Sequence, residues 1–337
     1  MINIALIGYG YWGANYVRAF NELPDVKVTL ICDTNEDRLR LARERYPLLG
    51  TSANPEEALN NKWIDAVVVA TPARAHFEFT QQALLKGKHV LVEKPMTTRV
   101  ADGEELIRTA EQQGRVLMVG HTFLFNAGVR KVKELISAAD FGKVYYLHAT
   151  RTNLGPVRHD VNALWDLAAH DIAIFDHLLN AMPQWVSAVG QRVLGNPRED
   201  VAFVSLHYPG EVLANLHVSW VDPNKVREIV VVGSQRRIVF DDLNNLERVR
   251  IFEKGVTPSQ VETDSYGEFR LLVRDGDILS PRIETSEPLK NQAMHFCDCI
   301  RKGQAPLSDG RNGLAVVRVL AAIDQSLAKN GAPVEIR

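Results

Sequence analysis

The sequence has no excess of basic residues. Its 39 lysines and arginines are balanced by 41 aspartates and glutamates, so the formal net charge at pH 7 is -2. Proteins that bind nucleic acid or anionic membranes use an excess of cations to neutralise phosphates. The basic stretch at residues 37–45 alternates with acids at helical spacing, which is typical of a solvated helix face. The composition therefore predicts neither a nucleic-acid partner nor a membrane partner.

Long apolar runs and cysteines are also scarce. No stretch approaches the roughly 20 apolar residues that span a bilayer, and the chain begins with a strand pattern instead of a basic leader segment. Of the three cysteines, Cys297 and Cys299 form a C-x-C pair without the second ligand pair of a zinc site. We therefore expect no metal site, reduced thiols and a cytoplasmic location.

The first part of the chain alternates strand patterns with helical patterns. Hydrophobic residues make up 46% of the 337 residues, a length that favours two domains. Continuous Val/Ile/Leu runs occur at residues 2–8, 26–33, 66–71, 89–94 and 115–121, separated by helical patterns at 12–23, 36–46, 73–86 and 100–113. Such runs are typical of a parallel sheet buried on both faces. We predict a doubly wound α/β Rossmann domain over residues 1–122.

The pattern changes after residue 122. Strand-like segments with period-two alternation follow at residues 143–152, 201–208, 212–220, 227–233, 236–242 and 248–253, with helical patterns at 164–179, 287–302 and 310–329. Short turns between these strands favour an antiparallel or mixed sheet. We predict an α+β domain with a mostly antiparallel sheet over residues 123–337. The final residues are compatible with a return to the first domain.

Three glycines mark the first strand-to-helix turn. Gly8, Gly10 and Gly13 follow a buried strand, and Asp33 ends the second strand 20 residues after Gly13. In this arrangement the glycines allow a tight turn and the approach of a pyrophosphate to a helix N-terminus, while the carboxylate accepts from ribose hydroxyls. A carboxylate repels a 2′-phosphate, so the sequence favours NAD over NADP. Arg38 and Arg40, which are able to bind such a phosphate, are expected on a solvent-exposed helix face.

Two further motifs carry groups suited to acid–base chemistry. Lys94 stands at the end of the strand pattern at residues 89–94, in "VEKPM", where it is able to donate to a substrate oxygen; the alternative is a surface lysine paired with Glu93. Asp166 and His170 are four residues apart, so on an α-helix the carboxylate is able to orient the imidazole as a base. The alternative is a helix-start acid with an incidental histidine. The acids and histidines of this helix spread around it, which disfavours a metal site.

Together these motifs resemble the glucose-fructose oxidoreductase/inositol dehydrogenase/MocA (Gfo/Idh/MocA) family. The resemblance rests on G-x-G-x-x-G, "EKP" near residue 94 and D-x-x-x-H, and it extends to "GHTFLFN" and the "GLAVVRVLAAIDQSL" helix. It implies a Rossmann domain followed by a domain with a large open sheet. The exposed face of that sheet usually forms the subunit interface, so a homodimer or homotetramer is expected.

The resemblance also implies roles for individual residues. It assigns catalysis to Lys94, Asp166 and His170. The cofactor set is Gly8, Gly10, Tyr11, Trp12, Gly13, Asp33, Thr71, Pro72, His76, Glu93 and Lys94. Many sugar and inositol dehydrogenases carry "GG" before the aspartate, whereas this chain has "VNALWD". Residues 151–171 instead resemble the subgroup that acts on nucleotide-linked sugars, with Asn153, Arg158 and Asn162, together with Arg151 and His159, as candidates for binding the substrate.

The expected reaction is NAD-dependent oxidation of a secondary hydroxyl, at C3, of a nucleotide-linked sugar such as UDP-N-acetylglucosamine. Two alternatives stay open: a dehydrogenase of a free sugar or inositol or a 3-ketosugar reductase, and a nicotinamide-binding regulator without turnover. The regulator is disfavoured because it needs none of Lys94, Asp166 and His170. The sequence does not choose between His170 and Lys94 as the base.

Overall fold

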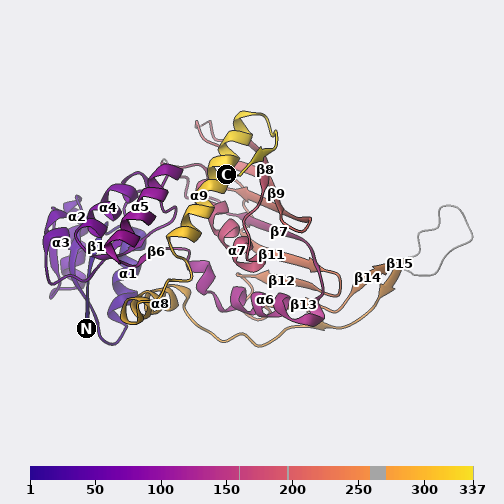
Figure 1. The fold of residues 1–337 in the computed structure, drawn as a ribbon, viewed down its shortest axis with the longest axis horizontal. Helices are drawn as coiled ribbons and strands as arrows, with labels where there is room; N and C mark the ends of the chain where they lie inside the picture. Colours follow the sequence, from indigo (N-terminus) through magenta and orange to yellow (C-terminus); the bar gives the residue numbers. More distant parts are fainter. Residues whose placement is uncertain (159, 196, 259–270, 337) are drawn as a thin grey trace, which may run out of the picture. The chain divides into compact units, whose positions relative to one another are not determined.

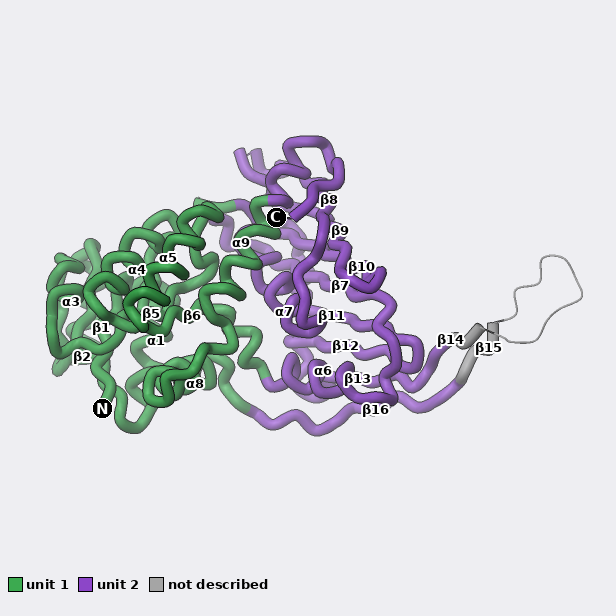
Figure 2. Tube along the Cα trace, viewed as in Figure 1, with its two compact units in different colours: residues 1–126, 159–161, 286–321 green, residues 127–158, 162–285, 322–337 purple. Residues whose placement is uncertain are grey.

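The chain divides into two compact units, which Figure 2 distinguishes by colour. The structure, a computed structural model, describes residues 1–158, 160–195, 197–258 and 271–336. The first unit contains residues 1–126, 159–161 and 286–321, and the second contains residues 127–158, 162–285 and 322–337. Residues 286–321, which the sequence analysis assigned to the second domain, thus belong to the first unit.

The first unit contains the predicted parallel sheet (Figure 1). Its six strands lie in the order β3-β2-β1-β4-β5-β6, and every pairing is parallel. The strands are β1 (Ile2–Ile7), β2 (Val26–Cys32), β3 (Gly50–Ser52), β4 (Ala66–Val69), β5 (His89–Val92) and β6 (Leu117–Val119). This topology confirms the predicted Rossmann fold and places the carboxyl ends of β1, β4, β5 and β6 along one edge.

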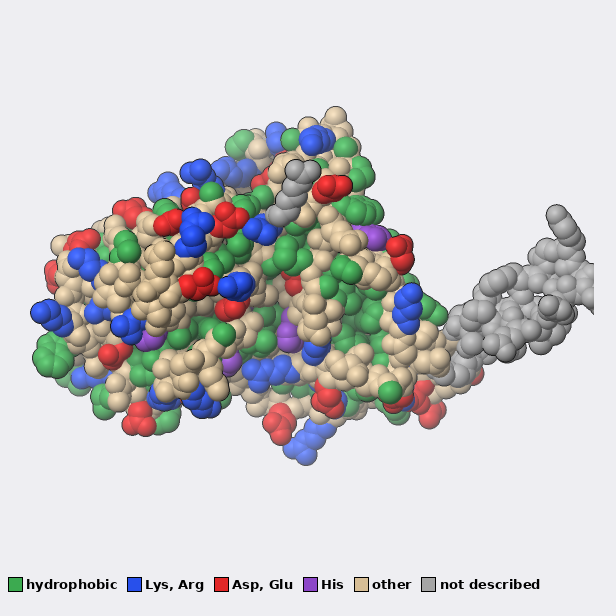
Figure 3. Space-filling model, in the orientation of Figure 1, with side chains coloured by type: hydrophobic (Ala, Val, Ile, Leu, Met, Phe, Trp, Pro, Cys, Tyr) green, Lys and Arg blue, Asp and Glu red, His purple; other side chains and the backbone are tan. Residues whose placement is uncertain are grey.

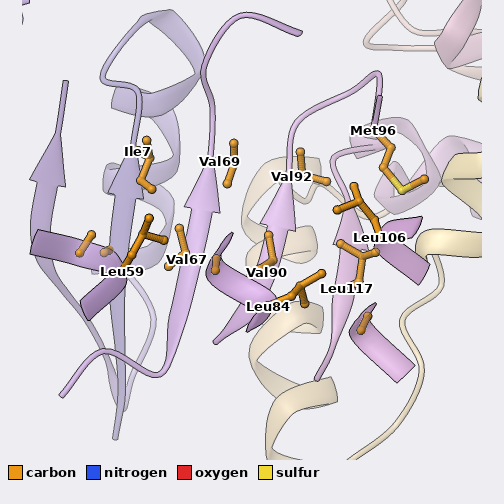
Figure 4. Packing of buried hydrophobic residues seen from close by; sticks show 14 of the residues in the cluster. Ile7, Leu59, Val67, Val69, Leu84, Val90, Val92, Met96, Leu106 and Leu117 are labelled. Atoms are coloured by element: carbon orange, nitrogen blue, oxygen red, sulfur yellow. The ribbon is translucent and has the colours of Figure 1, made fainter. Parts of the chain in front are cut away.

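Helices cover both faces of this sheet. The helical segments of this unit are α1 (Tyr11–Asn21), α2 (Glu36–Arg45), α3 (Glu56–Asn60), η1 (Ala73–Ala75), α4 (His76–Leu85), α5 (Val100–Gln113), η2 (Thr122–Phe125), α8 (Pro288–Lys302) and the first part of α9 (Gly310–Ala328), up to residue 321. Leu59, Leu84 and Leu106 of α3, α4 and α5 pack in one buried cluster with strand residues such as Val69 and Val92 (Figure 4). The strands are therefore buried along their length, as their Val-rich runs predict.

Helix α1 packs against α8, although almost the whole second unit separates them in the sequence. The rings of Phe20 and Phe296 meet edge to face at 6.4 Å, and both side chains are fully buried. Tyr16 of α1 accepts a hydrogen bond from Gln292 of α8 at 3.0 Å. These contacts explain why α8 belongs to the first unit.

The second unit is built on a nine-stranded sheet. Its order is β16-β13-β12-β11-β7-β10-β9-β8-β17; β7 and β10 pair in parallel and the other neighbours are antiparallel. The strands are β7 (Val144–Thr152), β8 (Trp185–Gln191), β9 (Val201–Tyr208), β10 (Val212–Ser219), β11 (Val226–Gly233), β12 (Arg237–Asp241), β13 (Val249–Phe252), β16 (Ile278–Leu279) and β17 (Val334–Glu335). This sheet confirms the predicted, mostly antiparallel second domain. Strand β17 pairs with β8, so the C-terminal segment joins the second unit.

Besides the end of α9, the described part of the second unit contains further helical segments and a small two-stranded sheet. The helical segments are α6 (Ala127–Ser137), η3 (Ala139–Phe141), η4 (Leu164–Ala168) and α7 (Ala169–Leu179), and the small sheet pairs β14 (Gly255–Pro258) with β15 (Leu271–Arg274). Helix α6 packs on β12 and β13, and η4 packs on β10.

One face of the nine-stranded sheet carries exposed apolar side chains. Tyr146, Val189, Phe203 and Leu213 each lie about half exposed on β7, β8, β9 and β10. Their neighbours in sequence, such as Leu147 and Val204, are fully buried on the opposite face. The Phe203 ring also stacks on His217 of β10 at 4.4 Å. In a single chain this apolar face is therefore accessible.

The surface otherwise carries mixed charge. On the face drawn in Figure 3, acidic and basic side chains are interspersed, in keeping with the near balance of the two kinds in the sequence. Within the described ranges, every helix is too short or too polar to cross a membrane.

Candidate active site

The backbone of the glycine loop leaves no room for side chains at two of its three glycines. Gly8 has a φ of +97°, and a Cβ there would lie 2.6 Å from the carbonyl oxygen of Ala70. A Cβ on Gly13 would lie 2.0 Å from the Gly8 oxygen. Gly8 is thus required by backbone conformation and Gly13 by helix–strand packing.

Gly10 leaves the start of α1 open. A Cβ there would meet one atom within 4 Å, Nη1 of Arg38 at 3.9 Å, and Gly10 is the N-cap residue of α1. The first N–H groups of a helix have no intrahelical acceptor, so they are available to an anion such as a pyrophosphate. Tyr11 and Trp12 lie exposed on this first turn with their rings edge to face at 5.4 Å.

Asp33 is fixed beside this loop at the end of β2. Its Oδ2 accepts the backbone N–H of Tyr9 at 2.7 Å, and its Oδ1 accepts that of Asn35 at 2.8 Å. Arg38, which the sequence analysis expected simply in solvent, donates to Oδ2 at 3.3 Å. The carboxylate therefore has a set orientation, as recognition of ribose hydroxyls requires.

The loop after β4 supplies a further group that suits a ligand. Thr71 is only partly exposed, and its Oγ1 is buried without a hydrogen-bond partner among the described residues. Pro72 is the N-cap residue of η1, and its ring restricts its own φ, which is -58°. The open helix start, the fixed Asp33 carboxylate and the unpartnered Thr71 hydroxyl together fit a dinucleotide at this edge of the sheet.

His76 ties two loops of this edge together. Its Nδ1 is 2.7 Å from the carbonyl oxygen of Pro95, and its Nε2 is 2.8 Å from that of Thr71. The side chain is fully buried. His76 thus joins the loop after β4 to the loop that carries Lys94, a structural contribution that the cofactor assignment did not include.

Lys94 is not a surface lysine, because its exposed fraction is 6%. Glu93 beside it accepts the Lys94 backbone N–H on Oε2 at 3.0 Å and the Tyr16 hydroxyl on Oε1 at 2.6 Å. Burial, and then the Glu93 charge, hold the pKa of Tyr16 well above its usual value. The Tyr16 hydroxyl therefore stays protonated and donates to the Glu93 carboxylate. That carboxylate in turn accepts the backbone N–H of Lys94.

His121 is a residue of this edge that the sequence analysis did not assign. It follows β6, the strand next to β5, and both of its ring nitrogens are buried without a partner among the described residues. Burial, and then the nearby Lys94 charge, lower the pKa of His121 to about 3, so the ring is neutral. Its place in "GHTFLFN", at the carboxyl end of the predicted strand at residues 115–121, is the sequence signal that marks it.

In the second unit, Asp166 lies in a π-helical turn. The four-residue spacing of Asp166 and His170 predicts a regular α-helix through both residues. Residues Leu164–Ala168 instead form a π-helix that continues into α7 at Ala169. Such turns are rare and occur frequently at functional sites. The direction of the Asp166 carboxylate is therefore set by its partners and not by α-helical spacing alone.

Arg158 and Trp220 both donate to that carboxylate. Arg158 donates from Nη1 to Oδ1 of Asp166 at 3.2 Å, and Trp220 donates from Nε1 to Oδ2 at 3.3 Å. Arg158, a candidate for binding substrate, thus contacts a candidate for catalysis. Trp220, which follows β10, was missed because nothing in the local sequence relates it to Asp166.

A buried ion pair fixes α7 next to His170. Arg151 lies in β7, within the predicted strand at residues 143–152, and it donates from Nε and Nη2 to both carboxylate oxygens of Asp171 at 2.8 and 2.7 Å. Both side chains are at most 5% exposed. A bidentate pair of this kind sets the rotation of the helix, so Arg151 positions α7 and is not accessible to a substrate.

The two asparagines proposed for substrate binding have local partners. Asn153 donates to the carbonyl oxygen of Gly155 within its own turn. Asn162 accepts the Trp165 backbone N–H at 3.0 Å, and its Nδ2 is 3.3 Å from Glu199. These contacts stabilise a turn and a helix start. His159 lies outside the described residues.

Family models match both parts of the chain. Residues 2–121 match the model described as the GFO/IDH/MocA oxidoreductase family, NAD-binding Rossmann fold. Residues 129–239 match the GFO/IDH/MocA C-terminal domain.

Known proteins are similar over most of their length. The scyllo-inositol 2-dehydrogenase (NAD(+)) of Bacillus subtilis is 24% identical over 99% of this chain and 96% of its own. The UDP-N-acetylglucosamine 3-dehydrogenase of Acidithiobacillus ferrooxidans is 28% identical over 74% of this chain and 76% of its own. A crystal structure of the WlbA dehydrogenase of Bordetella pertussis, in complex with NADH and UDP-GlcNAcA, has a TM-score of 0.81 at 22% identity and covers 100% of this chain and 99% of its own. At that identity the structural likeness concerns the fold.

Proposed function

Because the chain belongs to the Gfo/Idh/MocA family of oxidoreductases and carries its NAD-binding Rossmann domain, we propose that it oxidises a secondary hydroxyl, at C3, of a nucleotide-linked sugar such as UDP-N-acetylglucosamine. The observation that carries the oxidoreductase assignment is the fixed Asp33 carboxylate beside a glycine loop that admits no side chain at Gly8 or Gly13. The UDP-N-acetylglucosamine 3-dehydrogenase at 28% identity supports the substrate class.

The first unit contributes the cofactor site and Lys94. When bound, the nicotinamide accepts a hydride from the carbinol carbon. Tyr16 and Glu93 hold the backbone at Lys94 through hydrogen bonds of 2.6 and 3.0 Å. With its backbone fixed, the Lys94 ammonium donates a hydrogen bond to the substrate oxygen as that oxygen becomes a carbonyl.

The proposed base is His170. His170 takes the hydroxyl proton at a ring nitrogen, and the Asp166 carboxylate balances the charge of the resulting imidazolium. Arg158 and Trp220 each occupy one oxygen of Asp166, which keeps that carboxylate in one orientation. The alternative is that Lys94 takes the hydroxyl proton and His170 donates a hydrogen bond to the substrate oxygen.

A second candidate is a dehydrogenase of a free sugar or inositol, or a 3-ketosugar reductase. It is favoured by the match of the scyllo-inositol 2-dehydrogenase to 99% of this chain. It also agrees with the Arg158 contact, because a guanidinium that holds Asp166 is less available to a diphosphate. A free polyol has no diphosphate and needs no such cation.

We further propose that a second copy of the chain covers the apolar face of the nine-stranded sheet. Tyr146, Val189, Phe203 and Leu213 are about half exposed there, and an uncovered apolar face of this kind favours association. A homodimer or homotetramer is expected, and light scattering measures which one forms.

The test is NADH formation with the enzyme at a concentration similar to that of the sugar and NAD in excess. The panel holds UDP-N-acetylglucosamine, its uronic acid, glucose and myo-inositol. Single turnover is used because oxidation to a ketosugar is unfavourable at equilibrium and escapes steady-state assays. A signal confined to the nucleotide sugars supports the proposal, whereas a signal confined to glucose or inositol supports the second candidate. No signal with any of the four would contradict both.

A further inference from the structure

The exposed apolar face of the nine-stranded sheet also carries three histidines among its described residues. They are His148 on β7, His207 on β9 and His217 on β10. His148 follows Tyr146 by two residues, so both side chains lie on the same face. The register of β9 and β10 places His207 opposite Leu213. It places His217 opposite Phe203 in the same way. All three histidines therefore lie among the half-exposed apolar residues of this face.

Each of these histidines stacks on an aromatic ring of the same face. The pairs are His217 with Phe203 at 4.4 Å, His207 with Trp185 at 5.2 Å and His148 with Tyr146 at 6.5 Å between ring centroids. The two rings of each pair lie within 20° of parallel. A partner that covers the aromatic rings therefore covers the imidazole rings as well.

The neighbours of the histidines across the sheet are uncharged. They are Asn215 and Val230 for His148, Trp185 and Leu213 for His207, and Phe203 and Thr150 for His217. Within the described residues, the charged groups that act on the histidines are Glu228 and Arg237 for His148, Glu211 for His207 and Asp222 for His217. The Glu211 carboxylate, 3.7 Å from Nε2 of His207, is 89% exposed, and Glu228 also pairs with Arg250 at 3.9 Å. Because exposed pairs contribute little, a positive charge on these imidazoles has weak compensation within one chain.

Burial already disfavours a charge on these rings in a single chain. Loss of contact with water lowers the pKa of His148 and of His217 from the ordinary 6.5, and the carboxylates nearby offset this only in part. The His207 side chain is 20% exposed, and its Nδ1 is buried without a hydrogen-bond partner among the described residues. A second copy on this face removes the remaining water, and an imidazolium buried without a carboxylate is costly. The covered form therefore binds protons less tightly than the uncovered form.

The aromatic stacking does not reverse this order. An aromatic face attracts a cation, so each stack favours the imidazolium over the neutral ring. Each stacked pair lies within one chain, so this attraction is present whether or not a second copy covers the face. It is also smaller than the cost of burying an unpaired charge. The difference in proton affinity between the two forms therefore keeps its sign.

We propose that protonation of His148, His207 and His217 separates copies of this chain, so that the interface over this sheet forms at neutral pH and opens on acidification. This inference rests on the proposed covering of the face by a second copy, and it does not depend on which sugar is the substrate. Because assembly excludes protons, association weakens as the pH falls below about 6.5, the ordinary histidine value. A symmetric pair carries each histidine twice, which steepens the response.

The test is the Kd for self-association of the full chain, measured by analytical ultracentrifugation at about pH 8 and about pH 5.5, a range in which histidines titrate and exposed carboxylates stay ionised. The proteins are the wild type, His148→Gln, His207→Gln, His217→Gln, the triple variant and, as a matched control on α7, His177→Gln. Each histidine that has to lose a proton raises the Kd by up to about tenfold at the lower pH, so we expect the wild-type Kd to rise by at least about 100-fold. The Kd of the triple variant should change by less than about threefold, and His177→Gln should respond as the wild type does.

The single variants keep the test decisive even if the triple variant fails to assemble. Each should lose part of the pH response, whatever its Kd at the higher pH. The inference is overturned if the wild-type Kd changes by less than about threefold between the two pH values, if no single variant reduces the change, or if His177→Gln reduces it as much. Unfolding at the lower pH, followed by circular dichroism, also overturns it, because the switch requires folded chains that separate. A chain that is monomeric at both pH values contradicts the proposed second copy itself, on which the inference rests.

Discussion

Arg158 donates to Asp166 at 3.2 Å, so a residue expected to bind the substrate holds a residue expected to assist the base. Arg158→Ala should therefore lower kcat for every substrate that turns over, and not only raise KM for nucleotide sugars. We expect a loss of about 10- to 100-fold, because Asp166 keeps Trp220 as a partner. Steady-state kinetics with one nucleotide sugar and one free sugar measure this. A rise in KM confined to the nucleotide sugar, with kcat unchanged, would assign Arg158 to the diphosphate instead.

Lys94→Ala and His170→Ala test the catalytic assignment. Each removes a group proposed to hold or take a proton, so turnover should fall by at least about 100-fold. Binding of NADH, followed by its fluorescence, should persist in both variants because the glycine loop and Asp33 are unchanged. Turnover close to that of the wild type in both variants would refute the assignment.

Tyr16→Phe tests whether the buried hydroxyl acts through Glu93 on Lys94. Without the 2.6 Å hydrogen bond to Oε1, the Glu93 carboxylate loses one restraint and the Lys94 backbone is held less firmly. We expect kcat to fall about tenfold with little change in KM or in NADH binding. Phe20→Leu on the same helix is the control, since Phe20 packs on Phe296 and its replacement should lower stability without changing kcat. Equal kcat values for Tyr16→Phe and wild type would mean that the hydroxyl serves stability alone.

His121→Leu should stabilise the protein. It removes two buried nitrogens that have no hydrogen-bond partner among the described residues, and the free energy of unfolding should rise by about 1–3 kcal/mol, the cost of leaving such groups unpaired. Urea denaturation measures the change. His89→Leu is the control, because His89 accepts the Val116 N–H at 3.0 Å and its loss should destabilise. Destabilisation by both substitutions would show that His121 contributes through packing.

Asp176 on α7 should make stability fall as the pH rises. Its Oδ1 accepts the Tyr208 hydroxyl at 2.7 Å, and burial raises the pKa of Asp176 from 3.8 to about 8. Between these two values the unfolded chain releases this proton and the folded chain keeps it, so unfolding becomes progressively easier until the pH reaches about 8.

The substitution Asp176→Asn removes this titration. Relative to wild type, the variant should gain stability between about pH 5 and pH 8, and we expect a gain of about 1–3 kcal/mol at the upper end, the scale of burying an unpaired polar group. Urea unfolding at several pH values measures the difference. A difference between the two proteins that is constant with pH would contradict a raised Asp176 pKa.

The sequence predicted the elements whose signals are local. The Rossmann strands β1, β2, β4, β5 and β6 are continuous apolar runs, and the glycine loop with Asp33 is a fixed spacing between neighbouring elements. The three-residue strand β3 and the five-residue helix α3 are shorter than the segments over which periodicity is read, about 4–8 residues for a strand and about 11–18 for a helix. Strand β8 was missed because small residues interrupt its alternation.

The contacts that hold the candidate site are long-range, and no spacing in the sequence expresses them. Tyr16 and Glu93 are 77 residues apart, and Trp220 and Asp166 are 54 residues apart. The π-helical turn at Asp166 likewise follows from no composition rule, because propensities describe the α-helix. For Asn162, a functional role was predicted where the contacts are structural. Its side chain accepts the Trp165 backbone N–H, as a polar residue before a helix often does.

The place of residues 286–321 in the first unit has a consequence for biosynthesis. Residues 1–126 emerge from the ribosome long before α8 is synthesised. Tyr16 and Phe20 of α1, however, contact Gln292 and Phe296, which lie in α8. The nascent Rossmann sheet therefore exposes one side of α1 until α8 has been synthesised. A gene fragment that encodes residues 1–126 alone should yield an aggregation-prone product. We therefore expect that this dinucleotide-binding segment cannot be moved into another protein as an independent domain.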